Sequence, residues 1–575
     1  MSGILGLFDP DGVDARRLQR AAAPAAYRGA HEITVVGDTL AVGVLSRSGD
    51  TARLQSTSRS TLALDGRVDA VIRWRAGSDP SRPGAAVLQE RLEHQGATVL
   101  NDFAAEFALA FAPRGSGDLL LARDAFGLHP LYVATRGRRV GFASDPAVLV
   151  AMGIAGENLD PVVVAAYLAR NEPLDGRTAF RDVRALLPGT WMRVCRDGSR
   201  DAGQWFDPEL LQGPRLSRED AIDAIREAVG VAVRCRVHGR RCGVSLSGGR
   251  DSGSVAIAAA REGIDAVGIT QTFDPDLPVR EDHLARALCD RHGLGWVAAP
   301  VRSCPTRAQL DDVPRWSGTP LTYFGFAQAT AAVDAASEAG IDVVLTGEGG
   351  EPLFTSSDVV VLDLVRTGHP VRAVRAARNF HEVWGRSYGR LAKVTGRAIA
   401  PRPLLDLRER VRPVPPWVRG KVARTFFEET AARSDRQALL MALRTPHPAG
   451  YDLDERLYQT RGIEPAYPLL DLRVVSVALS LALSDRAPIE RPKPMLAAAF
   501  LGELADDRVK MSFVPYYERL ATRMHQEYPE LFSADGLAPR RGLVDPGGLD
   551  SIHRDEWKID SLGIAVLELW LRRPI

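Results

Sequence analysis

The pattern of apolar and polar residues divides the chain into two parts of different texture. Up to about residue 205, short apolar runs such as Ile33–Val36, Thr39–Leu45, Phe107–Phe111 and Asp118–Leu121 are separated by Gly, Asp and Pro. Short runs bounded by turn residues are typical of β-strands. This part is therefore predicted to consist of short strands with few long helices.

From about residue 215 the pattern alternates between helical periodicity and short buried runs. Helices are predicted over 218–233, 252–262 and 281–292, and strands over 242–246, 266–270, 296–300 and 341–345. Strands that alternate with helices at this spacing predict a parallel, doubly wound sheet. Ligands of such sheets bind beyond the carboxyl ends of the strands, where the segments 247–252 and 346–351 both fall.

Length and composition indicate an ordinary two-domain protein. A chain of 575 residues is too long for one core, so we expect two domains, 1–205 and 206–575. The formal net charge of +1 gives no argument for nucleic acid or an anionic membrane as a partner. Five cysteines without a CxxC pair are typical of reduced thiols, which predicts a cytoplasmic protein. No apolar stretch approaches the ~20 residues that span a bilayer.

The most informative segment is the turn Ser247-Gly-Gly-Arg-Asp-Ser252, which joins a predicted strand to a helix. Such a turn exposes backbone N–H groups that bind nucleotide phosphates, and glycines at 248 and 249 allow a close approach. Asp251 supplies an oxygen ligand of the kind that magnesium prefers. The alternative is an ordinary strand–turn–helix connection. The turn resembles the pyrophosphate-binding loop of ATP-pyrophosphatase enzymes, and the absence of a GxxxxGK(S/T) motif disfavours γ-phosphoryl transfer.

One segment, 372–424, is strongly basic, with fourteen Lys or Arg against three acidic residues. It is interpreted as a solvated helical insertion or, alternatively, as a docking surface for an acidic peptide or partner protein. RNA binding is a weaker third interpretation, because aromatic residues suited to base stacking are sparse there.

Seven segments resemble, in order, motifs of the asparagine synthetase family. They are Tyr27–His31, Leu121–Tyr132, Phe142–Asp145, Leu187–Gly189, Thr346–Glu351, Tyr467–Asp471 and Arg491–Leu496. The resemblance implies an N-terminal domain of the amidotransferase type, with αββα layers, and a C-terminal adenylating domain with a doubly wound parallel sheet and helical additions.

The N-terminal domain departs from the family pattern at the positions that handle glutamine. Ser2 stands where glutamine-using members have the nucleophilic Cys, although a hydroxyl can serve as a nucleophile in other enzymes. The expected Asn-Gly-Glu reads Asp65-Gly66-Arg67, which reverses a charge, and Arg-Gly-Pro-Asp reads Arg28-Gly-Ala-His31. We therefore expect this domain to be an inactive relic that releases no ammonia.

A synthetase without an ammonia source needs an amine from its substrate. Two groups of enzymes within the family that this chain resembles use such an amine. β-Lactam synthetases close a small ring, whereas lasso peptide cyclases adenylate an Asp or Glu side chain of a leader-free core peptide that its own α-amine then attacks. Glu348 stands where the β-lactam enzymes have Tyr, and the block Arg508–Phe513 resembles that of lasso cyclases. The lasso interpretation implies a ribosomal core peptide, a leader-binding protein and a leader peptidase as partners. The alternatives are an ammonia-dependent asparagine synthetase, a β-lactam synthetase and a non-catalytic peptide scaffold.

The resemblance also implies ATP and Mg²⁺ and a role for each site residue. The expected phosphate contacts are Leu246, Ser247, Gly248, Gly249, Asp251 and Ser252, followed by Ile269, Thr346 and Gly347 for adenosine and by Arg508 and Lys510 for pyrophosphate. Asp251 and Glu351 resemble the two magnesium carboxylates, while Pro352 replaces an acidic residue of the family. Glu348 is expected to receive the amine proton or, alternatively, to be structural. Lys493 is expected to neutralise charge on the adenylate or tetrahedral intermediate.

Overall fold

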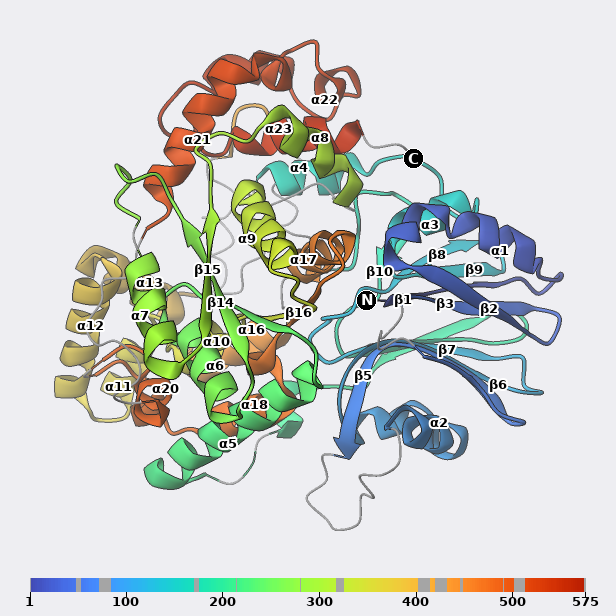
Figure 1. Cartoon of the computed structure of the whole chain (residues 1–575), viewed down its shortest axis with the longest axis horizontal. Helices are drawn as coiled ribbons and strands as arrows, with labels where there is room; N and C mark the ends of the chain where they lie inside the picture. The colour runs from blue at the N-terminus through green and yellow to red at the C-terminus, as the bar shows by residue number, and fades with distance from the viewer. Residues whose placement is uncertain are drawn as a thin grey trace.

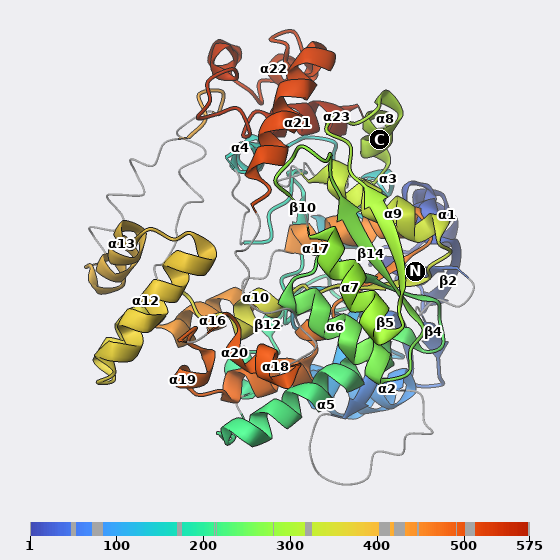
Figure 2. The same cartoon turned by 60° about the vertical axis from the view of Figure 1, so that its left-hand side comes forward.

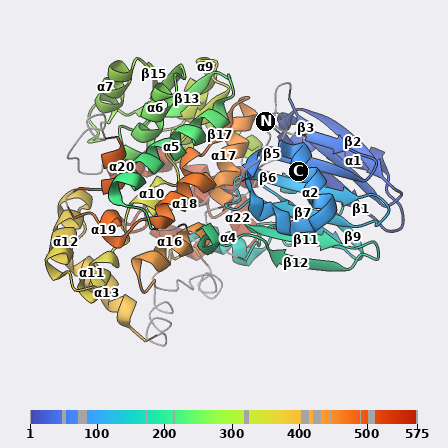
Figure 3. The same cartoon turned by 90° about the horizontal axis from the view of Figure 1, so that it is seen from below.

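The chain folds into two domains that lie side by side (Figure 1). The computed structural model describes residues 2–47, 53–71, 84–169, 175–211, 213, 215–279, 281–316, 325–401, 414–418, 432–444, 448–489, 491–500 and 512–572. The N-terminal domain is a β-rich body, and the C-terminal domain is a larger α/β body; the view from below separates them most clearly (Figure 3).

Two six-stranded sheets form the N-terminal domain. The first consists of β10 (Val183–Ala185), β8 (Tyr132–Arg136), β9 (Arg139–Ala143), β1 (Ser2–Phe8), β3 (Leu40–Ser46) and β2 (Ala30–Val36). The second consists of β12 (Arg200–Gln204), β11 (Thr190–Val194), β7 (Leu119–Arg123), β6 (Phe103–Pro113), β5 (Ser60–Val71) and β4 (Arg53–Ser56). The two sheets bury apolar residues between them, among them Ile4, Val42, Ala108 and Leu121.

Helices cover the outer faces of these sheets. In Figure 1, α1 (Ala15–Ala21) and α3 (Pro146–Ala151) lie over the first sheet and α2 (Gly84–Gln95) lies under the second. The helix α4 (Pro161–Leu168) packs toward the C-terminal end of the chain. The layers therefore follow the αββα order that the sequence predicts, with the expected short strands.

A five-stranded parallel sheet is the centre of the C-terminal domain. Its strand order is β15 (Gly295–Pro300), β14 (Ala266–Thr272), β13 (Cys242–Ser245), β16 (Val343–Leu345) and β17 (Glu464–Ala466). All four pairings are parallel. This confirms the predicted parallel sheet, while β17, a three-residue strand containing Pro465, lacks a sequence signal and was not predicted.

Helices cover both faces of this sheet. One face carries α5 (Arg218–Val237), α6 (Arg250–Arg261) and α7 (Asp282–His292), and the other carries α9 (Phe326–Glu338) and α17 (Pro448–Thr460). Val244 packs in the same apolar cluster as Ile257 of α6, whereas Val344 packs with Val333 of α9. From β13 the sheet is extended on one side by β14 and β15 and on the other side by β16 and β17. The order in which the chain adds strands therefore reverses between β13 and β16. Crevices at such a switch point are where open α/β sheets bind ligands.

Further helices surround the sheet. They are α8 (Arg307–Trp316), α10 (Gly350–Phe354), α11 (Val360–Arg366), α12 (Pro370–Trp384), α13 (Tyr388–Ile399), α16 (Asp435–Arg444), α18 (Leu472–Ser480), α19 (Leu483–Arg486), α20 (Pro494–Ala499), α21 (Val514–Glu527), α22 (Leu537–Arg540) and α23 (Leu562–Leu571). In Figure 2, α12 and α13 project beside α16 at one end of the molecule. Within the described ranges no helix is long and apolar enough to cross a membrane.

The helix α17 joins the two domains through buried ion pairs. Its Asp452 accepts a hydrogen bond from Arg123 at 2.6 Å, and its Glu455 pairs with Arg28 at 3.1 Å. Both arginines belong to the N-terminal domain and are fully buried. Removing one member of such a pair leaves an uncompensated buried charge, which is strongly destabilising. The domains are therefore fixed against each other by specific charges.

Candidate active site

The loop that follows β13 has the shape of an anion-binding turn. The Ser247 amide donates to the Ser252 hydroxyl at 3.2 Å, and the Gly249 amide donates to the Ser247 hydroxyl at 3.3 Å. Gly248 has φ +70°, and a Cβ there would lie 3.0 Å from the Glu281 carbonyl oxygen. The turn thus requires glycine at 248 and leads directly into a helix N-terminus, where phosphate groups bind.

Two details of this loop differ from the sequence prediction. The helix α6 begins at Arg250, so Asp251 and Ser252 lie in its first turn. The Leu246 amide donates to the Ile269 carbonyl at 2.9 Å, which continues the sheet beyond β13. The sheet thus uses the Leu246 N–H, so a contact between Leu246 and ATP, which stays a prediction, would have to use another group of this residue. The side chains of Leu246 and Ile269 are buried and belong to the core of the C-terminal domain.

The loop after β16 packs directly against the first loop. A Cβ on Gly347 would lie 2.6 Å from the Ser252 amide nitrogen, and a Cβ on Gly350 would lie 2.3 Å from Asp251 Oδ1. These two glycines are needed because the backbone of one loop touches the other. As predicted, the two segments meet at the carboxyl ends of neighbouring strands, here β13 and β16.

Lys493 brings a third segment into the same place. Its ammonium pairs with the Asp251 carboxylate and lies 3.8 Å from Glu351 Oε2. The residue is 8% exposed and has the left-handed backbone conformation, with φ 49°. This conformation costs a non-glycine residue roughly 1–2 kcal/mol. Pro494, at the first position of α20, follows directly. Lys493 and the two predicted magnesium carboxylates therefore form one cluster.

Glu348 lies at the rim of this cluster. Its side chain is exposed, and its amide donates to the Thr346 hydroxyl at 3.3 Å. The neighbouring helix α17 contributes Asp454, whose pKa is raised to about 7 by burial and by the charge of Glu348. Burial also raises the pKa of Tyr451, again with help from Glu348. Asp454 is therefore a carboxyl that can change its protonation state near neutral pH beside the Glu348 charge.

Asp454 and Tyr451 were not predicted from the sequence. The segment 448–460 contains no recognisable motif, and the pattern of its acidic residues is typical of the polar face of a helix. The available signal was the density of carboxylates at Asp452, Asp454 and Glu455 within a helix that is otherwise largely apolar or neutral. Of the other predicted contacts, Arg508 and Lys510 lie outside the described residues.

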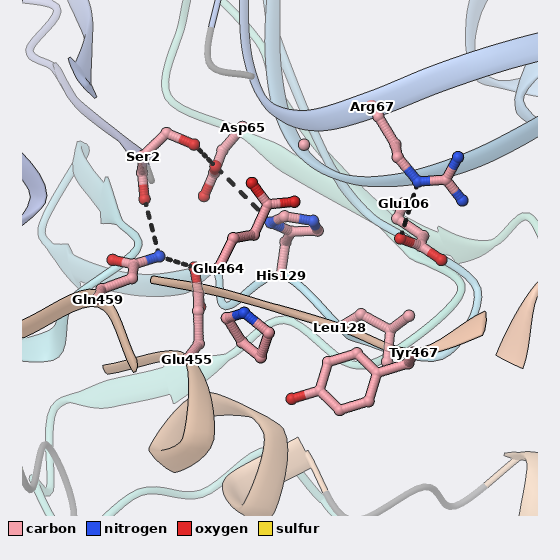
Figure 4. A pocket seen from close by; sticks show the side chains of 12 residues that line it. Ser2, Asp65, Arg67, Glu106, Leu128, His129, Glu455, Gln459, Glu464 and Tyr467 are labelled. Carbon is pink, nitrogen blue, oxygen red and sulfur yellow. Dashed lines mark hydrogen bonds and ion pairs between the residues drawn. The ribbon is translucent and has the colours of Figure 1, made fainter. Parts of the chain in front are cut away.

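A second polar centre occupies the position of the expected glutamine site in the N-terminal domain (Figure 4). The Ser2 hydroxyl donates to Asp65, and His129 Nδ1 lies 3.7 Å from the same carboxylate. Burial alone would lower the pKa of His129, but the Asp65 charge raises it to about 10. Despite burial, His129 and Arg28 hold the pKa of Asp65 at about 2. Both members of this pair are therefore charged at neutral pH.

The cavity at this centre is small. Its volume is about 20 Å³, and it is lined by Ser2, Asp65, His129 and, from the C-terminal domain, Glu455 and Gln459. Such a volume holds about one water molecule. Asp65, His129 and Glu455 each offer one atom within 4.8 Å of the others, a spacing compatible with a metal ion. The Arg28 guanidinium, which pairs with Glu455 at 3.1 Å, already supplies positive charge there.

Arg67, the residue with reversed charge, also connects the domains. It pairs with Glu106 at 3.1 Å and with Asp471 at 3.4 Å. Asp471, from the predicted Tyr467–Asp471 motif, caps α18 and accepts from Arg236 at 2.9 Å. Although burial opposes it, Arg473, Arg236 and Arg67 together lower the pKa of Asp471 far below its usual range. The substitution at 67 thus places a cation where it binds the partner domain.

Comparisons with known proteins agree with this architecture. Residues 224–572 match the family described as asparagine synthase, and residues 68–206 match the glutamine amidotransferase domain. Amidase chyE of Penicillium rubens is 25% identical over 292 residues, covering 48% of this chain and 43% of that protein. The glutamine-hydrolyzing asparagine synthetase 2 of Bacillus subtilis is 26% identical over 189 residues, covering 31% of this chain and 25% of that protein. The chain thus spans less than half the length of these curated relatives.

Among solved structures, the allosteric regulatory enzyme of purine biosynthesis is 12% identical. The match covers 53% of this chain and 82% of that one, with a TM-score of 0.25. A TM-score this low does not indicate a common fold. The fold is assigned from the sheet order and from the family matches.

Proposed function

Because the chain belongs to the asparagine synthase family, we propose that it is an ATP-dependent, AMP-forming ligase that closes a macrolactam ring in a peptide. In this proposal it adenylates an Asp or Glu side chain of a leader-free core peptide, and the peptide's own α-amine attacks the activated carbonyl. The observation that carries the activation step is the cluster of Asp251, Glu351 and Lys493 beside the Ser247–Ser252 turn. The proposed partners are the ribosomal core peptide, a leader-binding protein and a leader peptidase.

The residues of this cluster fit ATP and Mg²⁺. The turn offers backbone N–H groups and the hydroxyls of Ser247 and Ser252 at the N-terminus of α6. Asp251 and Glu351 would hold Mg²⁺, which shields the negative charge of the phosphates when bound. Lys493 lies between these carboxylates and would move onto negative charge that develops on the substrate.

The small N-terminal cavity supports a substrate that carries its own amine. With room for about one water, the cavity is far too small for glutamine, and its charges are already paired. The Ser2 hydroxyl donates a hydrogen bond to Asp65, but the low pKa of this carboxyl, about 2, makes it a weak base for activating the hydroxyl. We infer that this domain has a structural role and supplies no ammonia.

The proposed reaction has two steps. In the first, a side-chain carboxylate oxygen attacks the α-phosphorus of ATP, and pyrophosphate leaves to give the acyl adenylate. In the second, the neutral α-amine attacks the acyl carbon, the tetrahedral intermediate expels AMP, and the nitrogen loses one proton. Glu348, in the same loop as Glu351, and Asp454, which feels the Glu348 charge, are the candidate acceptors of this proton. An α-amine with a pKa near ~7.7–8.0 needs only a weak base of this kind.

A panel of synthetic leader-free peptides, each with a free N-terminus and one Asp or Glu, tests the proposal. Incubation with ATP and Mg²⁺ should give a product that lacks one water, together with an equal amount of AMP. Formation of asparagine from free aspartate and ammonium would instead favour an ammonia-dependent asparagine synthetase. Ring closure of a small carboxyalkyl amino acid would favour β-lactam synthesis, and absence of AMP with every substrate would favour a non-catalytic scaffold.

A further inference from the structure

A second pocket lies beside Glu351 and has no role in the proposed reaction. Its volume is about 200 Å³, and its walls come from α10 and the loop after it, from α16, and from Arg386 and Arg486. This volume is roughly ten times that of the N-terminal cavity and exceeds the room for a single water. We refer to the pocket lined by Thr355, Ser356 and Ser357 as the hydroxyl pocket.

The three consecutive hydroxyls of this pocket have no hydrogen-bond partner among the described residues. The hydroxyl oxygens of Thr355, Ser356 and Ser357 are all buried, and Thr355 and Ser356 are only 7% and 2% exposed as residues. A buried hydroxyl without a partner costs about 1–3 kcal/mol, so three in a row call for an explanation. Their backbone is well fixed, since the Ser357 amide donates to Asp435 at 2.7 Å and the Thr355 amide to the Glu351 carbonyl at 3.0 Å.

The charged groups of the hydroxyl pocket are neutralised within the protein. Arg486 pairs with Asp435 at 3.0 Å and donates to the Thr355 carbonyl at 3.4 Å. Arg386 pairs with Asp358. Glu351, which also lines the pocket, lies 3.8 Å from the Lys493 ammonium. The remaining walls are apolar and come from Pro352, Ala438, Leu439 and Ala442. What the pocket offers a ligand is therefore neutral hydroxyls and apolar surface.

We propose that the hydroxyl pocket binds the uncharged main chain of a peptide next to the carboxylate that is activated. A peptide bond has one N–H donor and one C=O acceptor, and a hydroxyl can both donate and accept. A free amino acid would instead bring an α-ammonium and an α-carboxylate, whose burial requires partner charges that this pocket has already used. The assignment rests on the proposed function and deepens it by naming the part of the peptide that the pocket holds.

The position of Arg386 connects the pocket with the basic segment 372–424. Arg386 follows α12, so this segment contributes one residue to the wall of the hydroxyl pocket. Figure 2 shows α12 and α13 standing next to α16, which forms another wall. A peptide held in the pocket would thus leave it along this segment.

Two small probes separate the main-chain requirement from the chemistry. N-acetyl-aspartyl-methylamide and free aspartate carry the same side-chain carboxylate, but only the first has an uncharged main chain. ATP–pyrophosphate exchange reports activation without needing an amine. We expect N-acetyl-aspartyl-methylamide to stimulate exchange and free aspartate to have little effect.

The variant Thr355→Val/Ser356→Ala/Ser357→Ala removes the three hydroxyls with little change of shape. Each lost hydrogen bond is worth a factor of about two to ten, so the loss of all three should raise the KM for N-acetyl-aspartyl-methylamide about ten- to a thousandfold. The melting temperature should stay level or rise, because no native hydrogen bond of these hydroxyls is lost. The exposed pair Thr98→Val and Ser116→Ala, in the N-terminal domain, is the matched control.

The outcomes distinguish this inference from the proposed function. Equal or better exchange with free aspartate, an unchanged KM in the triple variant, or a clear fall in its melting temperature would each overturn the pocket assignment while leaving activation intact. Absence of exchange with both probes and with every leader-free peptide would overturn the proposed function and this inference with it.

Discussion

Lys493 and Asp251 lie 242 residues apart in the sequence and form a partly buried ion pair in the folded chain. Lys493 also lies 3.8 Å from Glu351, so one ammonium is shared by the two carboxylates that resemble magnesium ligands. If these carboxylates hold magnesium as proposed, the lysine and the metal ion would compete for the same negative charge. This relationship makes Lys493 a residue that can hold the site together before ATP binds and stabilise the substrate afterwards.

Replacing Lys493 should separate these two roles. We expect Lys493→Ala to slow ring closure by ~10²–10³, the usual cost of losing one preorganised donor. The concentration of Mg²⁺ needed for half-maximal ATP–pyrophosphate exchange should fall, because the carboxylates no longer pair with the ammonium. Mass spectrometry of the product and AMP release measure closure, and Lys558→Ala serves as the control. Near-normal closure by Lys493→Ala would remove this lysine from the chemistry.

The magnesium carboxylates provide a second prediction. Glu351→Gln should abolish AMP formation, because a neutral amide is a poor magnesium ligand. This variant is cleaner than Asp251→Asn, since the Glu351 side chain is 48% exposed and its loss leaves Lys493 paired with Asp251. Asp282→Asn, in the first turn of α7, is a matched control outside the cluster. Turnover by Glu351→Gln at the wild-type rate would exclude Glu351 as a metal ligand.

The N-terminal cavity predicts the absence of glutaminase activity. Purified protein should release no glutamate from glutamine, and Ser2→Ala should leave ring closure unchanged. The reason is spatial as well as chemical, because a cavity of about 20 Å³ admits no glutamine. Glutamate release that disappears in Ser2→Ala would contradict the structural role given to this domain.

Asp454 predicts a dependence of ring closure on pH. Burial and the Glu348 charge raise its pKa to about 7, so Asp454 is largely protonated at acidic pH and cannot accept the amine proton. The closure rate should rise with pH through about 7 in the wild type, whereas Asp454→Asn should rise only where the α-amine itself titrates, near ~7.7–8.0. ATP–pyrophosphate exchange, which needs no amine, should change little over this range. An identical closure profile for wild type and Asp454→Asn would exclude Asp454 as the proton acceptor.

The same raised pKa affects stability. A carboxyl whose pKa is higher in the folded than in the unfolded chain stabilises the fold at pH values below its unfolded pKa, here 3.8, and loses this contribution as the pH rises through about 7. Asp454→Asn should therefore melt at a higher temperature than wild type above pH 7, and the advantage should disappear near pH 4. Thermal unfolding across this range measures the effect, and a constant difference at all pH values would contradict the raised pKa.

Local patterns allowed the sequence to predict the parallel sheet and the two loops at its carboxyl edge. Strand and helix periodicities are properties of neighbouring residues, and the glycines at 347 and 350 reflect close backbone contacts that leave a recognisable motif. The Lys493 motif was likewise recognisable, because prolines on both sides fix its backbone.

Interactions between distant segments explain what the sequence did not predict. Arg67 reads as a lost glutamine contact, and only the structure shows that it pairs with Asp471, 404 residues away. Asp454 lies on a helix that carries no motif, and only the fold brings it near Glu348 and partly buries it. The amide of Leu246 could not be assigned to the sheet from its sequence position, because the bond depends on the register of β13 with β14.

The central claim is that a carboxylate of the peptide is activated by adenylation and then captured by the peptide's own amine. A leader-free peptide from the panel, synthesised with heavy oxygen in its single Asp or Glu side chain, follows this path atom by atom. The account predicts that the cyclised peptide lacks one water and that each AMP released carries one heavy oxygen from that carboxylate. Heavy oxygen in inorganic phosphate with ADP as the nucleotide product, or unlabelled AMP beside a cyclised peptide, would contradict it.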